Sequence, residues 1–304
     1  MPLKSLKKPN IVWHYITGLA NEDLEFLKTN FKFHPLDLKD CAGEVQRSKI
    51  DIYNNYLFIV LQLPSFDQVR KVVTVDQCYI FVAKNYIITI TKNKLKSLNN
   101  IFYKIANSPK SQENISSQGT GYILYKILDY VLSGRWEIIG YLEDKVQAVE
   151  SHIESGQDEK LVFQIALLRR LILQFKSILD PQRLTINTLS RLKVSFLDQE
   201  TLVYFDDLDD FIEKIFFSLE SYRDRIITLQ EINESLLSYR TNKIMKILTV
   251  FSVALLPLTF LTGFYGMNID LPFASHPFSI WFLFGLLASL ILMTFFILKK
   301  KDWI

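Results

Sequence analysis

The C-terminal quarter of the chain contains two apolar stretches, ILTVFSVALLPLTFLTGFY at residues 247–265 and FSIWFLFGLLASLILMTFFIL at residues 278–298. Each is long enough for a helix rising about 1.5 Å per residue to cross a hydrocarbon core of about 30 Å. The only formal charge between residues 247 and 298 is Asp270, in a connector that begins Gly266-Met267-Asn268. A buried soluble hairpin is the weaker alternative, because two full-length stretches without a charge are typical of membrane spans. We therefore predict two transmembrane helices, 247–265 and 278–298.

Basic residues on the outer flanks of the two stretches predict the orientation. They are Arg240, Lys243 and Lys246 before the first stretch, and Lys299, Lys300 and Lys301 after the second. Because cytoplasmic flanks carry an excess of Lys and Arg, both termini are expected in the cytoplasm and the connector 266–277 on the far face of a cell (inner or plasma) membrane. No signal-peptide pattern opens the chain, so residues 1–205 are expected to form a cytoplasmic domain.

Composition gives no indication of an enzyme or a nucleic-acid-binding protein. The 304 residues carry a net charge of only +3, which gives no argument for a nucleic-acid partner. Cys41 and Cys78 are isolated and lack metal-ligand spacing, so reduced structural thiols are expected. No HExxH, nucleophile elbow, GxGxxG or Walker loop is present. No cofactor is expected.

The first part of the cytoplasmic region, about residues 1–106, is typical of an α/β domain. A strand is expected near 11–16 and a helix near 22–30, capped by Asn21. Residues 50–53 and 56–63, and residues 78–82 and 86–91, are β-rich pairs separated by short polar turns, which predicts two hairpins. Residues 107–121, rich in Ser, Gln, Asn and Gly, are expected to form a loop.

The second part, about residues 120–205, shows helical periodicity. One helix is expected from 122 to 155 and another to about 179, with a polar break at 156–158. This spacing predicts an antiparallel helix pair. After Pro181 the pattern is less regular until Asp206.

The longest periodic run begins at Asp206 and continues without a turn signal into the first apolar stretch. Its apolar and aromatic positions are Leu208, Ile212, Ile215, Leu219, Tyr222, Ile226 and Leu229, then Leu236, with Asn233 at the intervening position. A period of 3.5 residues fits a helix packed on its own domain or a coiled-coil-like contact between subunits, and both remain open. The run predicts one helix over 206–263, roughly 85 Å long. The segment 206–265 as a whole is expected to extend from the cytoplasmic domain into the first membrane span.

A stripe of polar and small side chains, together with Met245 and Leu256, follows one face of that helix through the first span. Its members recur by threes and fours: Asn242, Met245, Thr249, Ser252, Leu256, Thr259 and Gly263. Polar residues in a span usually face protein or a water-filled cavity, although small and hydroxyl residues also mediate dry helix packing. Two spans per chain cannot enclose a pore, so a pore requires several copies around an axis.

The sequence resembles the CorA-type magnesium transporters. The resemblance is carried by Gly266-Met267-Asn268 after Tyr265, by Thr241-Asn242-Lys243 through Lys246, by Pro257-Leu258-Thr259, by the terminal Lys299 to Trp303, and by His34-Pro35-Leu36-Asp37. It implies an α+β membrane protein with a cytoplasmic α/β domain, a long pore-lining helix and two C-terminal transmembrane helices, assembled as a funnel-shaped homopentamer.

The resemblance also implies roles for individual residues. Gly266, Met267 and Asn268 would form the selectivity loop, where the Asn268 amide carbonyl meets hydrated magnesium. Asn242 would form a polar ring at the inner pore, and Met245 and Leu248 a hydrophobic gate. Thr249, Ser252, Leu256 and Thr259 would line the path between gate and loop.

Four carboxylates in five positions, at Asp206, Asp207, Asp209 and Asp210, open the long helix. The resemblance places Asp207 and Asp210 where family members have acidic residues, and implies that Asp207 helps to bind a regulatory divalent cation between subunits. We take Asp207 and Asp210 as candidate regulatory ligands, with Asp67 of a neighbouring subunit as the candidate partner. Magnesium would then be both the transported and the regulatory ion. The alternative is that acids are simply favoured in the first turn of a helix.

The loop after Asn268 departs from the acidic loop of many family members, because only Asp270 is charged in Ile269 to His276. Cobalt, nickel and zinc therefore stay open as transported ions, and a zinc exporter of the same architecture is one alternative. A membrane-anchored metal sensor or scaffold is another, although a mere anchor has no need of Asn242, Ser252 and Thr259 in register.

Overall fold

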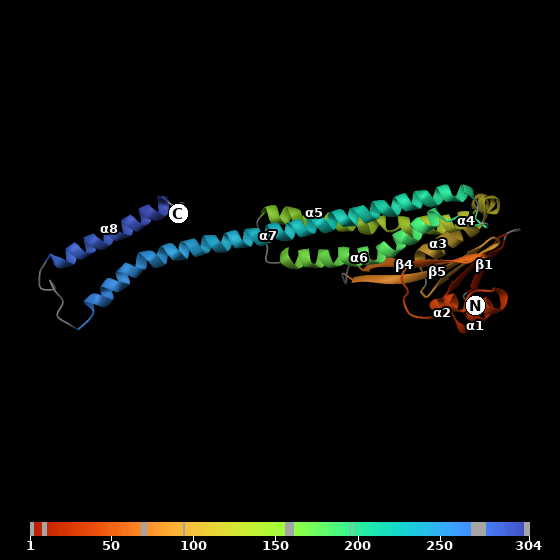
Figure 1. Ribbon diagram of the computed structural model, residues 1–304, viewed down its shortest axis with the longest axis horizontal. Coiled ribbons are helices and arrows are strands. Elements are labelled where there is room, and N and C mark those ends of the chain that lie inside the picture. Colours follow the sequence, from red (N-terminus) through yellow and green to blue (C-terminus); the bar gives the residue numbers. More distant parts are fainter. Residues whose placement is uncertain are drawn as a thin grey trace. The chain divides into compact units, whose positions relative to one another are not determined.

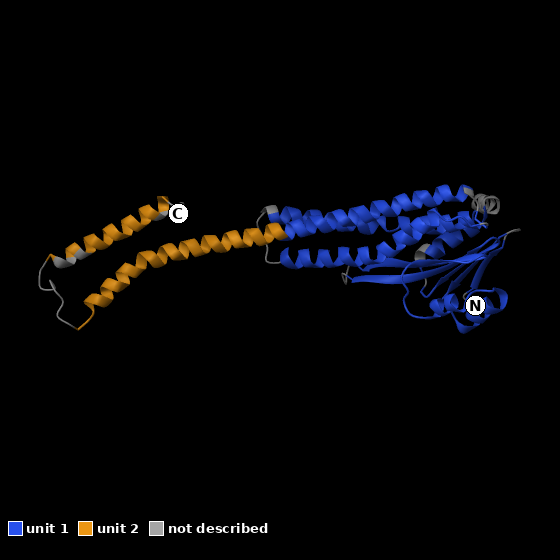
Figure 2. Cartoon of the chain, in the orientation of Figure 1, with its two compact units in different colours: residues 1–230 blue, residues 231–304 orange. Residues whose placement is uncertain are grey.

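The computed structural model describes residues 3–7, 11–67, 72–93, 95–155, 161–194, 196–197, 199–268 and 278–300. These residues fall into two compact units, Met1–Gln230 and Glu231–Ile304 (Figure 2). The elements of the first unit, in chain order, are β1 (Leu3–Lys7), β2 (Val12–Thr17), α1 (Asn21–Asn30), α2 (Pro35–Ala42), β3 (Lys49–Ile52), β4 (Tyr56–Asp67), β5 (Val72–Ala83), β6 (Tyr86–Thr91), α3 (Lys96–Ala106), α4 (Pro109–Ser133), α5 (Trp136–Ser155), α6 (Leu161–Ser190) and the short 3-10 helix η1 (Gln199–Thr201). Helix α7 (Leu202–Tyr265) begins in the first unit and ends in the second, which also contains α8 (Ser279–Lys300).

The six strands form one sheet in the order β1-β2-β6-β5-β4-β3. Only β2 and β6 are parallel, and the other neighbours are antiparallel. Both hairpins expected from the sequence are present, because β3 pairs with β4 and β5 pairs with β6. The longest pairing, between β4 and β5, was not predicted from the sequence. It runs from Tyr56↔Ala83 to Asp67↔Val72.

Helices cover both faces of this sheet (Figure 1), and alternate strand residues face the two layers. On β4, Leu57, Ile59 and Leu61 pack in the cluster with α3 and α4. Phe58 and Val60 pack in the opposite cluster with α1 and α2. Because both faces are covered, β4 and β5 contain continuous apolar or aromatic runs, residues 56–61 and 78–83, rather than a strict alternation with polar residues.

A buried arginine ties the sheet to the helices. The β3–β4 pairing ends at Lys49↔Val60, so the main chain at Gln62 has no strand on that side. The Gln62 carbonyl accepts hydrogen bonds from the side chains of Gln182 on α6 and Arg135 in the α4–α5 turn, and its N–H donates to Ser48 Oγ at 2.9 Å. Burial lowers the pKa of the Arg135 guanidinium to about 9.

Helices α5, α6 and α7 pack around a second core, to which α7 contributes the 3.5-residue repeat. Its buried members in this core are Ile215, Leu219, Tyr222, Ile226 and Leu229. Leu208 and Ile212 are also buried, in the core beside the sheet. Up to Leu229 the repeat therefore packs within its own domain, whereas Leu236 beyond it is exposed.

Two helical expectations were wrong in detail. Residues 109–133 form α4 rather than a loop, with one non-helical residue, Gly119, at φ 77°. The expected helix 122–155 is interrupted between α4 and α5, at residues 134–135. The break expected at 156–158 lies outside the described residues.

Three more boundaries differ from those expected. Helix α6 continues through Pro181 to Ser190, and buried residues on both sides of the proline hold it there, among them Leu179, Gln182 and Ile186. Helix α7 begins at Leu202, directly after η1, rather than at Asp206. Helix α1 takes Ala20, not Asn21, as its N-cap, and the Asp23 carboxylate accepts from the Ala20 N–H at 3.0 Å.

In the second unit, the apolar part of α7 is not buried inside the chain. Among the described residues, α7 is the one helix that is long and apolar enough to cross a membrane. The described apolar segment of α8, Phe284–Ile297, is shorter. A second transmembrane span therefore stays a prediction.

Candidate functional site

The seven candidate pore residues lie along one side of α7. They are Asn242, Met245, Leu248, Thr249, Ser252, Leu256 and Thr259. With 3.6 residues per turn, these positions fall within an arc of about 120° around the helix axis. The three apolar members are widely exposed within the chain, Met245 at 55%, Leu248 at 59% and Leu256 at 67%. This face of α7 therefore needs another environment or another molecule to cover it.

The threonine hydroxyls on this face are oriented by the helix itself. Thr249 Oγ1 donates to the Met245 carbonyl at 2.8 Å, and Thr259 Oγ1 donates to the Leu255 carbonyl at 2.9 Å. Because the proton of each hydroxyl is directed back along the helix, the oxygen lone pairs are left to accept from outside. A face of such acceptors suits a hydrated cation, whose water protons point outward.

The three-residue motif after the helix forms its C-terminal turn. The Gly266 N–H donates to the Thr262 carbonyl at 2.9 Å, and a Cβ at Gly266 would lie 3.0 Å from that same oxygen. Glycine is therefore favoured at position 266, because the main chain there lies close to the Thr262 carbonyl. Met267 is 51% exposed within the chain. Asn268 is exposed, and the rest of the connector, with Asp270 and His276, lies outside the described residues.

The acidic cluster lies further into α7 than the sequence indicated. Because α7 begins at Leu202, its first turn contains no acid, and the first-turn explanation for the cluster does not apply. Asp207 and Asp210 are exposed. Asp209 instead accepts a hydrogen bond from Asn187 Nδ2 on α6 at 2.8 Å. The cluster therefore divides into acids that face outward and one that joins two helices.

Tyr125 on α4 lies close enough to both Asp129 and Asp207 to feel their charges, a relationship that sequence reasoning missed. Burial, followed by the charges of Asp129 and Asp207, raises the pKa of Tyr125. Among the described residues, however, no group of three or more His, Cys, Asp or Glu side chains is placed to hold a metal ion. A cation bound at Asp207 would thus need ligands from elsewhere.

Asp67 does not meet Asp207 within one chain. Asp67 ends β4, and its neighbour Phe66 packs against Tyr141 on α5 and Phe175 on α6, with ring centroids 4.9 and 6.4 Å apart. Phe175 lies one residue from Lys176, whose partner on α7 is Glu220. Asp67 is therefore at the level of Glu220, about 20 Å along α7 from Asp207.

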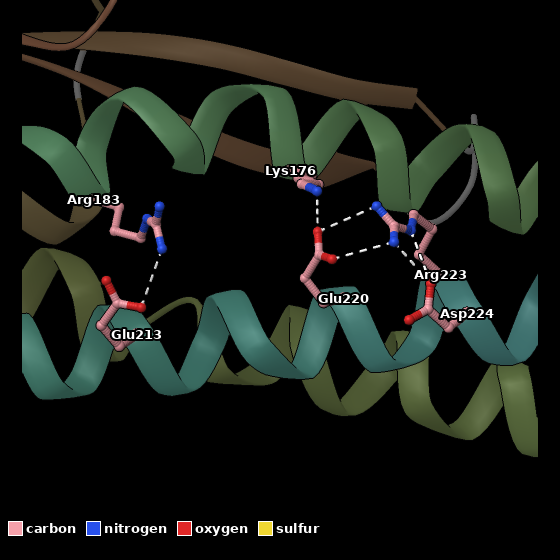
Figure 3. Close-up of polar contacts among 6 residues, drawn as sticks. All are labelled: Lys176, Arg183, Glu213, Glu220, Arg223 and Asp224. Atoms are coloured by element: carbon pink, nitrogen blue, oxygen red, sulfur yellow. Dashed lines mark hydrogen bonds and ion pairs between the residues drawn. The ribbon is translucent and has the colours of Figure 1, made fainter.

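A ladder of polar contacts joins α6 to α7, and sequence reasoning missed it as well (Figure 3). One contact joins Asn187 to Asp209. Figure 3 shows the other two, Arg183 with Glu213 and Lys176 with Glu220. Steps of four and seven residues back along α6 match equal steps forward along α7, as an antiparallel pair requires. Arg169 also contacts α7, where its Nη1 donates to Gln230 Oε1 at 3.0 Å. The spacing of seven between Arg169, Lys176 and Arg183 was the signal in the sequence.

These features define a class of protein: an α/β and helical unit whose last helix continues into an exposed apolar segment with a polar stripe. Comparison with known proteins identifies the family. The profile of the CorA-like Mg2+ transporter protein family matches residues 9–300, and the chain belongs to this family. It is a divalent-cation transporter of that family, whose members are transporters rather than enzymes.

Individual relatives support this assignment. The chain is 25% identical over 310 residues to the cobalt/magnesium transport protein CorA of Thermotoga maritima, covering all of this chain and 86% of that protein. It is 26% identical to the CorA protein of Methanocaldococcus jannaschii, covering 99% and 93%. The complete structure of the CorA magnesium transporter from M. jannaschii has the same fold, with a TM-score of 0.81, 24% identity and coverage of 99% and 94%.

The relatives do not share one named metal. The zinc transport protein ZntB of Yersinia pseudotuberculosis is 22% identical over 296 residues, covering 96% of this chain and 88% of that protein.

Proposed function

We propose that this protein carries magnesium into the cell through a pore lined by α7 from several copies of the chain. The proposal rests mainly on the single arc of α7 that carries four polar side chains and three exposed apolar ones, in an unburied apolar helix that ends directly before Gly266. A simple membrane anchor does not need Asn242, Ser252 and Thr259 on one face. Two spans cannot enclose a pore, so we propose a homopentamer with both termini of each chain in the cytoplasm.

The Gly266-Met267-Asn268 turn is proposed as the selectivity loop at the outer mouth. Magnesium gives up its water reluctantly and prefers oxygen ligands in octahedral geometry. A ring of Asn268 amide oxygens would accept hydrogen bonds from the hydration shell without stripping it, whereas a carboxylate ring would hold the ion too tightly to conduct.

The gate is proposed at Met245 and Leu248, with Asn242 one turn nearer the cytoplasmic unit. Both apolar side chains are exposed on the arc and would constrict a central path, which closes when it loses water. Thr249, Ser252, Leu256 and Thr259 would line the path above them. An inward potential of 100 mV acting on a divalent cation supplies about 4.6 kcal/mol, so no ATP and no cofactor is required.

Regulation is proposed at Asp207 and Asp210, with Asp67 supplied by a neighbouring copy. The exposure of both α7 acids and the separation of Asp67 from Asp207 within one chain support a site formed between copies. Cytoplasmic magnesium bound there would hold the copies together and the pore shut. Without the ion, repulsion among the carboxylates would loosen the assembly.

The test is uptake by liposomes that contain a magnesium-sensitive dye, under an imposed inside-negative potential. Native protein should give potential-dependent uptake, and Asn268→Ala should abolish it. Asn100→Ala, at an exposed position on α3, is the matched control and should transport normally. Zinc, cobalt and nickel are offered in parallel with suitable dyes. If inserted native protein carries zinc and not magnesium, the zinc transporter is the better description; if it carries no cation, the sensor or scaffold is.

A further inference from the structure

Some basic side chains of the first unit are paired with acids. In the first unit, Arg223 pairs with Glu220 and Asp224 on α7, and Arg225 pairs with Glu150 on α5 at 2.5 Å (Figure 3 shows the first group). In the second unit, four lysines are exposed, and within the described residues no carboxylate pairs with them: Lys243, Lys246, Lys299 and Lys300. We call these four residues the basic collar.

The sequence around the collar cannot neutralise it locally. Neither Asp nor Glu occurs from residue 235 to 269, or from residue 271 to 301. An acid three or four residues away on the same helix can pair with a basic side chain, as Glu220 does with Arg223. Each copy of the chain therefore presents a positive charge that must be balanced from outside the protein.

The collar lysines lie at matching distances from the connector between α7 and α8. Lys246 precedes the end of α7 at Tyr265 by 19 residues, and Lys299 follows the start of α8 at Ser279 by 20 residues. At about 1.5 Å per residue, both helices place their basic end about 30 Å from the connector, which is the thickness of a hydrocarbon core. Two helices inserted from the same connector would thus bring all four lysines to one interface.

We propose that the basic collar binds the phosphate groups of anionic phospholipids at the cytoplasmic interface. This inference rests on the membrane insertion assumed in the proposed function. Each ammonium offers three donors to phosphate oxygens, and lysines beside a span are attracted to anionic headgroups. Tyr239, 68% exposed and one turn before Lys243, supplies an aromatic side chain of the kind enriched at this interface. The occupant is a lipid rather than free phosphate because the bilayer holds the phosphate of a lipid headgroup at the level of the four lysines, whereas a free phosphate is not held there.

Binding is measured by titrating the full-length protein, in an uncharged detergent, with short-chain phosphatidylglycerol and with phosphatidylcholine of equal chain length. Native protein should bind phosphatidylglycerol more tightly than phosphatidylcholine, and salt should weaken that binding. Replacing all four collar lysines (K243Q, K246Q, K299Q, K300Q) should weaken it roughly tenfold or more. The matched control removes four exposed lysines of the first unit, K32Q, K39Q, K104Q and K214Q, and should bind as native protein does.

Equal binding by the native and collar-substituted proteins would overturn the proposal, and so would an equal loss in the control. Glycerol phosphate, titrated alone, must bind much more weakly than the lipid; equal affinity would mean a free-phosphate site instead. Far-ultraviolet circular dichroism verifies that each variant is folded. Cation uptake is measured separately, so failure to transport magnesium would count against the proposed function and would not change the lipid result.

Discussion

Arg183 on α6 donates a hydrogen bond to Glu213 on α7, with Nη1 and Oε2 3.3 Å apart, while its guanidinium carbon lies 4.2 Å from the centre of the Phe216 ring. The same side chain thus makes a charge contact and a ring contact to α7. Together with Asn187–Asp209 and Lys176–Glu220, it sets the register between the last helix of the soluble bundle and the helix that continues into the apolar unit.

The Arg183–Glu213 pair is expected to contribute only modestly to stability. Both side chains are 30% exposed, so solvent screens the charges and a coupling of about 0.5–1 kcal/mol is expected. Thermal unfolding of the full chain in detergent should give this value from a double-mutant cycle of Arg183→Ala and Glu213→Ala. Arg183→Lys keeps the charge but weakens the stacking on Phe216, and should fall between native protein and Arg183→Ala. Additive effects of the two alanine substitutions would contradict the coupling.

Gly266→Ala should impair transport with little loss of folded protein. The added Cβ would lie 3.0 Å from the Thr262 carbonyl, and the main chain must shift just where the proposed selectivity loop begins. Gly285→Ala on α8 is the control, because nothing lies within 4 Å of its Cβ. Uptake into liposomes should fall for the first variant and not for the second. Equal uptake by both would show that the position of this turn does not matter.

Thr259→Val should slow cation uptake about fivefold. The substitution keeps the shape and removes an acceptor oxygen from the α7 arc, at a cost of about 1 kcal/mol per contact with the hydrated ion. Thr262→Val removes a hydroxyl that also bonds the helix backbone but lies off the arc, so its uptake should stay close to native. A larger effect at Thr262 than at Thr259 would place the pore on a different face of α7.

Asp37 should make the stability of the first unit depend on pH. Burial raises the pKa of its carboxyl, although hydroxyls of Tyr56 and Tyr53, at 2.7 and 2.9 Å, oppose the shift. Its favourable contribution is therefore complete below the unfolded value of 3.8 and is lost as pH rises through the folded value. The melting temperature of native protein minus that of Asp37→Asn should decrease as pH rises from about 4 to 7. An increasing difference would mean that the two tyrosines outweigh burial.

Short-range patterns predicted much of the fold. The two hairpins follow from apolar runs around polar turns, and the buried positions of α7 up to Leu229 follow from the 3.5-residue repeat. The face occupied by Asn242, Thr249 and Thr259 also follows from spacing alone, because a helix fixes the angle between its residues.

Contacts between residues far apart in the chain decided the rest. Helix α6 continues through Pro181 because the residues on both sides of the proline are buried. The local sequence does not show which residues the folded chain will bury. Whether the α7 repeat packs on its own domain or between subunits was undecidable from its period. The structure shows the first up to Leu229, because α5 and α6 supply the matching apolar faces. The register of Arg183 on Glu213 likewise depends on two helices that only the folded chain brings side by side.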